Sequence, residues 1–258
     1  MNRKFFVVSD IHSFYDELMV ALTNQNFDKN NPDHVLICCG DLFDRGKQTT
    51  QLYNFCRELG DRFIYIKGNH EYLLDDCVYE MRCGKHPSSH HCSNGTVQTI
   101  LNLVGMEYNS PWFIPYIPSN TFTDIIDPFL EWIHSKTIDY FQLGKYVFCH
   151  GWIPRGKKFY EEFSKITPEE KEDASWKNGM SEWKKGETPP DTIVVCGHFH
   201  CSWGWSHIRQ QRKEYPQKNQ KDWLKSFEPF IDNGIMAIDA CTAYTGVVNC
   251  VVIDEKDI

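Results

Sequence analysis

The chain has 258 residues, of which 41% are hydrophobic and 24% charged, and this composition excludes a disordered, collagen-like or coiled-coil protein. Its 27 Lys and Arg against 35 Asp and Glu give a formal net charge of −8, which argues against a stable nucleic-acid partner. No apolar run approaches the roughly 20 residues that cross a bilayer, and no signal peptide is recognisable. We therefore expect a cytoplasmic protein without membrane contact.

Seven short apolar runs, rich in Val, Ile, Phe and Tyr, predict strands that are covered on both faces, as in α/β sheets. They are residues 4–9, 35–39, 63–67, 145–149, 192–196, 235–239 and 247–253. Helical patterns separate the first three runs, at residues 14–24, with Ser13 as the expected N-cap, and at residues 48–59. The order strand, helix, strand, helix, strand indicates an α/β fold.

Two further helix starts carry proline at the first helical position. Asp127 is expected to cap the helix that begins at Pro128, and Thr167 with Glu170 forms a capping-box pattern. We assign both helices to insertions, at about residues 77–140 and 155–190, and expect a basic loop at about residues 205–228. Because the chain has no repeat and no low-complexity linker, we expect one domain spanning residues 1–258.

The 11 cysteines are odd in number, and several lie inside apolar runs. Buried, reduced thiols explain them better than a disulfide framework does. A group of cysteines and histidines in the first insertion has the residue types of a zinc site; its members are Cys77, Cys83, His86, His90, His91 and Cys92. Their spacing matches no standard zinc finger, so we favour a solvated, partly packed insertion over a metal site.

Polar side chains of the kinds that bind ligands follow five of the predicted strands. They are Asp10 and His12; Asp41, Asp44 and Arg45; Asn69 and His70; His150; and His198 and His200. Ligand sites of open α/β sheets lie at the carboxyl ends of strands, so these side chains are expected to meet.

Carboxylates and imidazoles gathered at one sheet edge are destabilising unless their charges are compensated, and divalent cations compensate them. Aspartate and histidine without thiolate suit Mn²⁺, Fe or Zn²⁺, and a central carboxylate can bridge two ions. We therefore predict a two-metal site, with Mn²⁺ as the first choice. Two such ions activate water and stabilise phosphoryl transfer, which makes phosphoester hydrolysis the expected reaction.

The ordered motifs resemble those of the calcineurin-like metallophosphoesterases, and in particular of the phosphoprotein phosphatase branch. The motifs are Asp10-x-His12, Gly40-Asp41-x-x-Asp44-Arg45-Gly46, Gly68-Asn69-His70-Glu71, His150-Gly151 and Gly197-His198-x-His200. A later block, residues 239–246, is similar to bacterial members and to diadenosine tetraphosphatases. The resemblance implies two mixed sheets packed as a sandwich between helices.

The same resemblance implies roles for the motif residues. Asp10, His12 and His200 would hold one metal, Asp41 would bridge, and Asn69, His150 and His198 would hold the other. His70 would be the general acid, paired with Asp44, and Arg45 would bind the substrate phosphate together with Asn69. The alternative for Asp44 and Arg45 is a simple ion pair between neighbours.

One departure concerns a second arginine that relatives use to bind the phosphate. The corresponding segment, residues 174–179, contains no arginine, and Lys177 or Arg155 would have to replace it with looser geometry. The basic residues between Arg209 and Lys225 are interpreted as a solvated loop, with steering of anionic substrates as the alternative. Trp203, Trp205 and Trp223 are interpreted as insertion core, with a substrate platform as the alternative.

The predicted function is metal-dependent phosphoester hydrolysis by direct attack of a metal-bound hydroxide. A serine/threonine-type protein phosphatase, acting on a phosphorylated protein, is the first choice. A dinucleoside polyphosphate hydrolase, acting on a nucleotide polyphosphate, is the alternative, and a non-catalytic metal-binding scaffold is the third reading.

Overall fold

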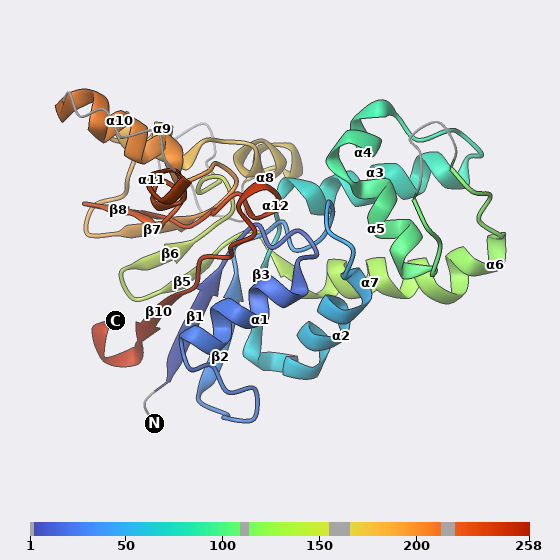
Figure 1. Ribbon diagram of the computed structural model, residues 1–258, viewed down its shortest axis with the longest axis horizontal. Helices are drawn as coiled ribbons and strands as arrows, with labels where there is room; N and C mark the ends of the chain where they lie inside the picture. Colours follow the sequence, from blue (N-terminus) through green and yellow to red (C-terminus); the bar gives the residue numbers. More distant parts are fainter. Residues whose placement is uncertain (1–2, 109–113, 155–165, 213–219) are drawn as a thin grey trace.

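The computed structural model describes residues 3–108, 114–154, 166–212 and 220–258. It contains two mixed five-stranded sheets flanked by helices, as predicted (Figure 1). The first sheet has the order β10 (Val251–Asp254), β1 (Lys4–Val8), β2 (His34–Cys38), β3 (Phe63–Ile66), β4 (Thr137–Ile138). The second has the order β5 (Phe141–Leu143), β6 (Tyr146–Phe148), β7 (Ile193–Cys196), β9 (Ile235–Ala237), β8 (Phe230–Asp232).

Strands β1 to β4 run parallel, and so do β6, β7 and β9, whereas β10, β5 and β8 pair antiparallel with their neighbours. Each of the seven apolar runs contributes a strand, so the predicted fold class is confirmed. The short strands β4, β5 and β8 were not predicted, because each has only two or three residues and no buried run.

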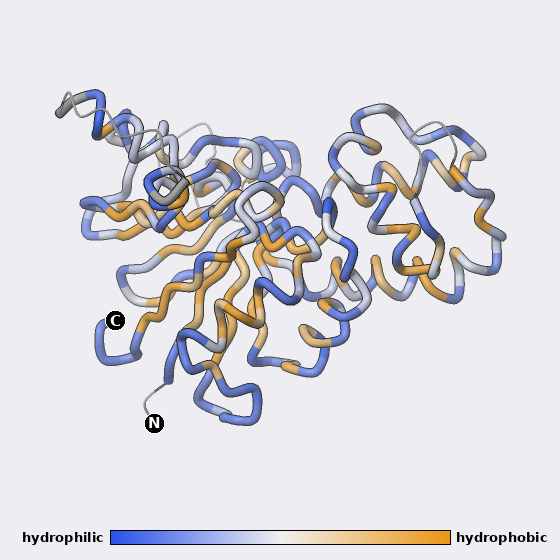
Figure 2. The backbone as a smooth tube through the Cα atoms, viewed as in Figure 1, coloured by the Kyte–Doolittle hydropathy of each residue, from blue (hydrophilic) through white to orange (hydrophobic). Residues whose placement is uncertain are grey.

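The alternation of side chains along β1 shows how the two sheets pack. Phe5 and Val7 point into a core that they share with Phe148 of β6, whereas Phe6 and Val8 point into the core under the helices. Successive side chains of a strand face opposite sides, so an all-apolar strand fills both cores. Figure 2 shows the resulting hydrophobic positions along the strands and hydrophilic positions in the outer loops.

Helices cover the outer faces of the sheets and build a lobe beside them (Figure 1). The longer ones are α1 (Tyr15–Asn24), α2 (Thr49–Leu59), α3 (Asn69–Arg82), α5 (Thr96–Leu103), α7 (Asp127–Lys136), α8 (Pro168–Ser175) and α10 (Ser202–Arg212). The shorter ones are α4 (Ser89–Asn94), α6 (Ser119–Thr121), α9 (Gly179–Lys184), α11 (Gln220–Lys225) and α12 (Thr242–Thr245). Residues of α5 and α7, including Val97 and Phe129, belong to the same buried cluster as Phe6, so the first insertion packs directly on the sheet core.

Of the three predicted helix N-termini, one is confirmed and two are wrong. Thr167 accepts a hydrogen bond from the Glu170 N–H and donates its own N–H to the Glu170 carboxylate, so the capping box is confirmed. The prediction for Ser13 was wrong: helix α1 is preceded by Phe14, and the Ser13 hydroxyl bonds that of Thr49 at 3.0 Å. The prediction for Asp127 was also wrong, because a π-helical turn precedes α7 and Asp127 is already helical.

Two sequence expectations about the whole chain can be compared with the described residues. All 11 cysteines are free, and most of them are buried. Within the described ranges, no helix combines the length and the apolar character that a membrane span requires.

Candidate metal centre

Backbone hydrogen bonds join the loops at the carboxyl ends of neighbouring strands and so bring the polar motifs together. The N–H groups of Asp10 and His12, after β1, donate to the carbonyls of Gly40 and Asp41, after β2. The N–H of Gly197, after β7, donates to the carbonyl of His150, after β6. The loops therefore continue the sheet pairing, and their side chains share one edge.

Left-handed backbone conformations concentrate in these loops. Their φ angles lie between 51° and 76° for Asp10, His12, Asp41, Asp44, Arg45 and His198. Non-glycine residues adopt this region at a cost of about 1 kcal/mol or more each, and such strain clusters at functional sites. Gly40, at φ +87°, has a second reason to be glycine, because a side chain there would collide with the ring of His150.

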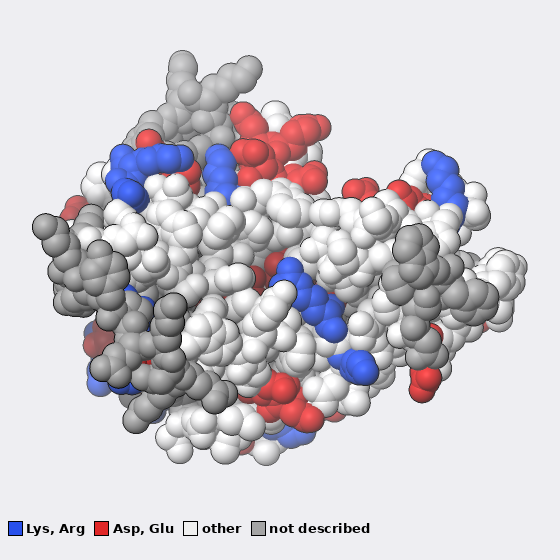
Figure 3. Space-filling view, turned by 45° about the horizontal axis from the view of Figure 1, so that its top comes forward, with Lys and Arg blue, Asp and Glu red and all other residues white. Residues whose placement is uncertain are grey.

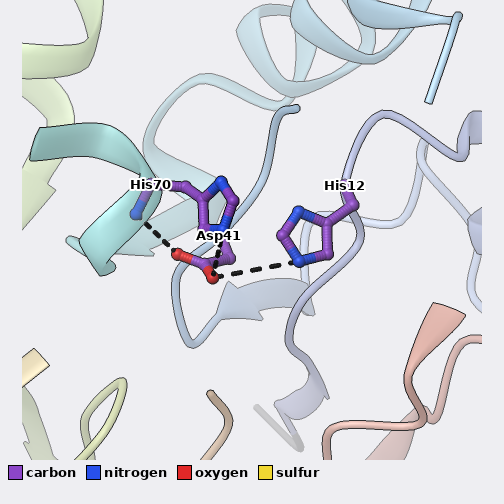
Figure 4. A group of neighbouring side chains, drawn as sticks. All are labelled: His12, Asp41 and His70. Carbon is purple, nitrogen blue, oxygen red and sulfur yellow. Dashed lines mark hydrogen bonds and ion pairs between the residues drawn. The ribbon is translucent and has the colours of Figure 1, made fainter. Parts of the chain in front are cut away.

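Asp41 lies at the centre of the buried side chains. Its Oδ2 is 3.9 Å from Nε2 of His12 and 3.8 Å from Nε2 of His70, and its Oδ1 is 3.2 Å from Nε2 of His150. Figure 4 shows His12 and His70 on either side of this carboxylate. Among the described residues, two groups have ligand atoms close enough to hold an ion, and Asp41 belongs to both: His12, Asp41 and His70, and Asp41, His150 and His198.

The imidazole rings of His12 and His150 are oriented by the backbone. Nδ1 of His12 lies 2.9 Å from the carbonyl oxygen of Phe43, and Nδ1 of His150 lies 2.7 Å from that of Cys39. Nδ1–H donates to a carbonyl in such pairs, which leaves the lone pair of Nε2 free to bind a cation. Both Nε2 atoms face Asp41, so the rings are preset to accept a cation.

The pKa values of the buried carboxylates and imidazoles also indicate a site that can bind a cation. Burial raises the pKa of Asp10 to about 6 and lowers that of His198 to about 3. Burial alone would lower the pKa of His150, but the Asp41 carboxylate raises it to about 10. Protons thus compensate the buried carboxylates when no cation is bound. A divalent cation can replace them, and metal binding to such a site releases protons.

The three remaining predicted metal ligands, Asn69, Asp10 and His200, lie in different surroundings. The side-chain oxygen of Asn69 is 2.9 Å from Nε2 of His150. Asp10 is buried and accepts hydrogen bonds from the Ser9 hydroxyl, at 2.6 Å, and from the N–H of His198. His200 is exposed and belongs to neither group of ligand atoms.

His70 and Asp44 form a buried pair at 2.7 Å between Nδ1 and Oδ2. Burial lowers the pKa of His70, but the charge of Asp41 and the hydrogen bond with Asp44 outweigh it and raise the pKa above its usual value. Arg45 is exposed, and its guanidinium lies 3.2 Å from Nε2 of His70. Arg45 therefore contacts the histidine rather than pairing with Asp44.

Helix α5 holds the Asp44 carboxylate, a feature that sequence reasoning missed. The Thr96 hydroxyl donates to Oδ2 and the Thr99 hydroxyl to Oδ1, each at 2.8 Å, and the Asp44 N–H lies 2.9 Å from the Thr99 hydroxyl. Both threonines are buried. The first insertion is thus part of the site, because it orients the carboxylate that orients His70.

Glu71 was quoted with its motif but given no role. Its carboxylate accepts hydrogen bonds from the N–H groups of Asp41, Leu42 and Gly68, and from the Tyr65 hydroxyl at 2.5 Å. It is buried at the start of α3 and ties the loop after β2 to the loop after β3. Asp41 and Asn69 depend on this carboxylate for their positions.

Replacing Glu71 by glutamine is expected to lower the free energy of unfolding by about 2–4 kcal/mol. The amide nitrogen cannot accept the backbone N–H bonds, so buried donors lose their partner. Urea denaturation of the metal-free protein measures the effect, and Glu58→Gln, at an exposed ion pair with Lys29, is the control. Equal stability of both variants would contradict this role.

Asp239, just after β9, is a second buried carboxylate that was assigned no role. Its Oδ1 accepts the Cys241 N–H at 2.6 Å, and burial, with the charge of Asp10 adding to it, raises its pKa to about 7. The signal was available in the sequence, because Asp239 ends the sixth apolar run.

Of the two residues proposed to replace the second arginine, Lys177 is the one that the structure describes. Lys177 pairs with Asp173 at 3.2 Å, one turn back in the chain. Arg155 lies outside the described residues, as do the side chains of residues 211–221 in the predicted basic loop. In the first insertion, Nε2 of His91 lies 3.6 Å from Glu80, and neither ligand group described above includes the cysteines and histidines considered for zinc.

Comparisons with known proteins found a matching family model and curated relatives. The family model of calcineurin-like phosphoesterases matches residues 3–232. Symmetrical bis(5'-nucleosyl)-tetraphosphatases of Hamiltonella defensa and Vibrio vulnificus are 35% and 38% identical over 69 residues, 27% of this chain and 24% and 25% of those proteins. The chain thus matches about a quarter of the length of these curated relatives.

Solved structures with similar folds are distant in sequence. A cold-active protein tyrosine phosphatase of a psychrophilic Shewanella species has a TM-score of 0.51 at 14% identity, over 97% of this chain and 75% of that one. A candidate diadenosine tetraphosphatase has a TM-score of 0.50 at 14% identity, over 97% and 89%. These likenesses concern the fold, and the family model covers nearly the whole chain. The chain belongs to the calcineurin-like phosphoesterase family.

Proposed function

We propose that this protein hydrolyses phosphoester or pyrophosphate bonds with two divalent cations that share Asp41. The observation that carries the proposal is the position of this carboxylate between two imidazoles, of His12 and His150, whose Nδ1 atoms are both held by backbone carbonyls. Asp10 and His200 would complete one cation's ligands, and Asn69 and His198 the other's. When bound, such cations polarise a phosphoryl group and lower the pKa of a coordinated water.

The chain's own residues supply the remaining functions. The exposed guanidinium of Arg45 is available for bidentate contact with phosphate oxygens. His70, held by Asp44 through Nδ1, presents Nε2 towards the central carboxylate and the guanidinium. A proton on Nε2 would be delivered to the leaving-group oxygen, which is the role of a general acid.

Two substrate classes follow from the sequence, phosphoproteins and dinucleoside polyphosphates. A specific observation favours the second class, because curated relatives that match the chain over 69 residues are symmetrical bis(5'-nucleosyl)-tetraphosphatases. Phosphoproteins remain the competing class, since protein phosphatases share the fold.

A substrate panel tests the reaction and the class together. With Mn²⁺ we expect hydrolysis of p-nitrophenyl phosphate, and with EDTA we expect none. A higher kcat/KM for diadenosine tetraphosphate than for a phosphoserine peptide supports the nucleotide class, and the reverse order overturns it. Failure on every ester, with metal bound, would point to a binding protein instead.

A further inference from the structure

A groove lined by aromatic side chains adjoins the candidate metal centre. It is open to solvent, has a volume of about 680 Å³ and is lined by Trp176, Phe199, His200, Ser202, Trp203 and Ser206. His198 also lines it and at the same time belongs to a group of candidate metal ligands, so the two sites are continuous. We call this feature the aromatic groove. It is comparable in volume with sites that hold nucleotide-sized ligands.

Two of the rings are unusually open to solvent. Trp176 is 40% exposed and Phe199 38% exposed. Their ring centroids lie 5.9 Å and 5.1 Å from that of His198, both at steep interplanar angles. They come from different parts of the chain, the end of α8 and the loop after β7, and Trp203 of α10 adds a third ring that also packs on the buried core of the second sheet.

The described lining of the aromatic groove carries no permanently charged side chain. Among the described residues that line it there is no Lys, Arg, Asp or Glu, and the polar groups are two serine hydroxyls and imidazole nitrogens. These described residues offer no permanent charge to pair with additional phosphates or with a charged peptide. This lining suits a flat, uncharged ring with hydrogen-bonding atoms at its edge. Aromatic side chains stack on the π-face of any nucleobase in this way.

We propose that the aromatic groove binds a nucleobase of the substrate, stacked on Trp176, while the attached phosphates extend to the metal centre. The proposal rests on the proposed function and selects the nucleotide polyphosphate class within it. Figure 3 shows acidic atoms inside a hollow at the centre of one face of the molecule, with basic atoms beside them. The base would thus supply affinity through stacking, and the phosphates would supply the reacting group.

Binding of ATP and of inorganic tripolyphosphate to Mn²⁺-loaded protein, measured by calorimetry, separates the two parts of the ligand. We expect ATP to bind the wild type about tenfold more tightly than tripolyphosphate. Trp176→Ala should remove this advantage and leave tripolyphosphate binding within about twofold, whereas Trp176→Phe should retain most of it. Trp223→Ala, at a 45% exposed tryptophan outside the aromatic groove, is the matched control and should change neither.

Equal binding of ATP and tripolyphosphate by the wild type would overturn the proposal, and so would an equal loss of both ligands in Trp176→Ala. If Trp176→Ala weakened the binding of a phosphotyrosine peptide more than the binding of ATP, the groove would be assigned to a protein substrate. This result would overturn the proposal as well. Hydrolysis of p-nitrophenyl phosphate in the same preparations distinguishes the outcomes. If hydrolysis persists, only the groove assignment fails. If hydrolysis is absent and tripolyphosphate does not bind, the proposed function fails.

Discussion

Replacing Asp41 by asparagine is expected to remove metal binding and hydrolysis together. The substitution keeps the shape of the side chain but removes the negative charge that faces His12, His70 and His150. Since a shared carboxylate contributes several kcal/mol to holding and using two cations, kcat/KM should fall by at least about 10³-fold. Dialysis against Mn²⁺ followed by elemental analysis measures the metal, and p-nitrophenyl phosphate turnover measures the activity.

Asp139→Asn is a suitable control for this experiment. Asp139 pairs with Lys171 at 2.6 Å in a partly exposed position and belongs to neither group of ligand atoms. This variant should bind as much Mn²⁺ as the wild type. If Asp41→Asn kept two ions per chain and activity within tenfold, the shared-carboxylate arrangement would be wrong.

His70→Asn is expected to slow poor leaving groups far more than good ones. An alkyl leaving group needs a proton as the bond to phosphorus breaks, whereas a nitrophenolate leaves without one. Loss of a general acid typically costs about 10²–10⁴-fold, so alkyl phosphates should slow in this range and 2,4-dinitrophenyl phosphate by less than about tenfold. Metal content should remain at two ions, because His70 belongs to neither of the ligand sets proposed for the two cations.

His134→Asn is the matched control, since His134 also bonds a carboxylate, that of Asp75 at 2.7 Å, but on the surface. It should leave every rate unchanged. A uniform loss for all leaving groups in His70→Asn would contradict the acid role. Loss of one ion would instead make His70 a metal ligand, as its group with His12 and Asp41 permits.

The fold could be predicted because its determinants are local. Each apolar run is long enough to form a strand and too short to form a buried helix. Parallel pairing of these strands places the motifs that follow them at one edge of the sheet. The contacts of Asp41, His150 and Asn69 therefore follow from the order of the runs. The short strands and the helix starts at Ser13 and Asp127 depended on tertiary contacts, which local patterns do not contain.

Three parts of the site lay beyond sequence reasoning for a physical reason. Thr96 and Thr99 reach Asp44 from an insertion more than 50 residues away, and nothing in their own segment marks them as partners of a carboxylate. The role of Glu71 depends on four donors converging in space. Trp176 lies in the segment of residues 174–179, which was considered only because it contains no arginine, and the exposure of Trp176 beside His198 emerged with the fold.

Diffraction from crystals grown with Mn²⁺, recorded near the manganese absorption edge, tests the two-cation site most directly. We expect two anomalous peaks separated by about 3.5–4 Å, with Asp41 contacting both ions. One should lie against His12 and the other against His150. A single peak away from Asp41, or none at millimolar Mn²⁺, would contradict it.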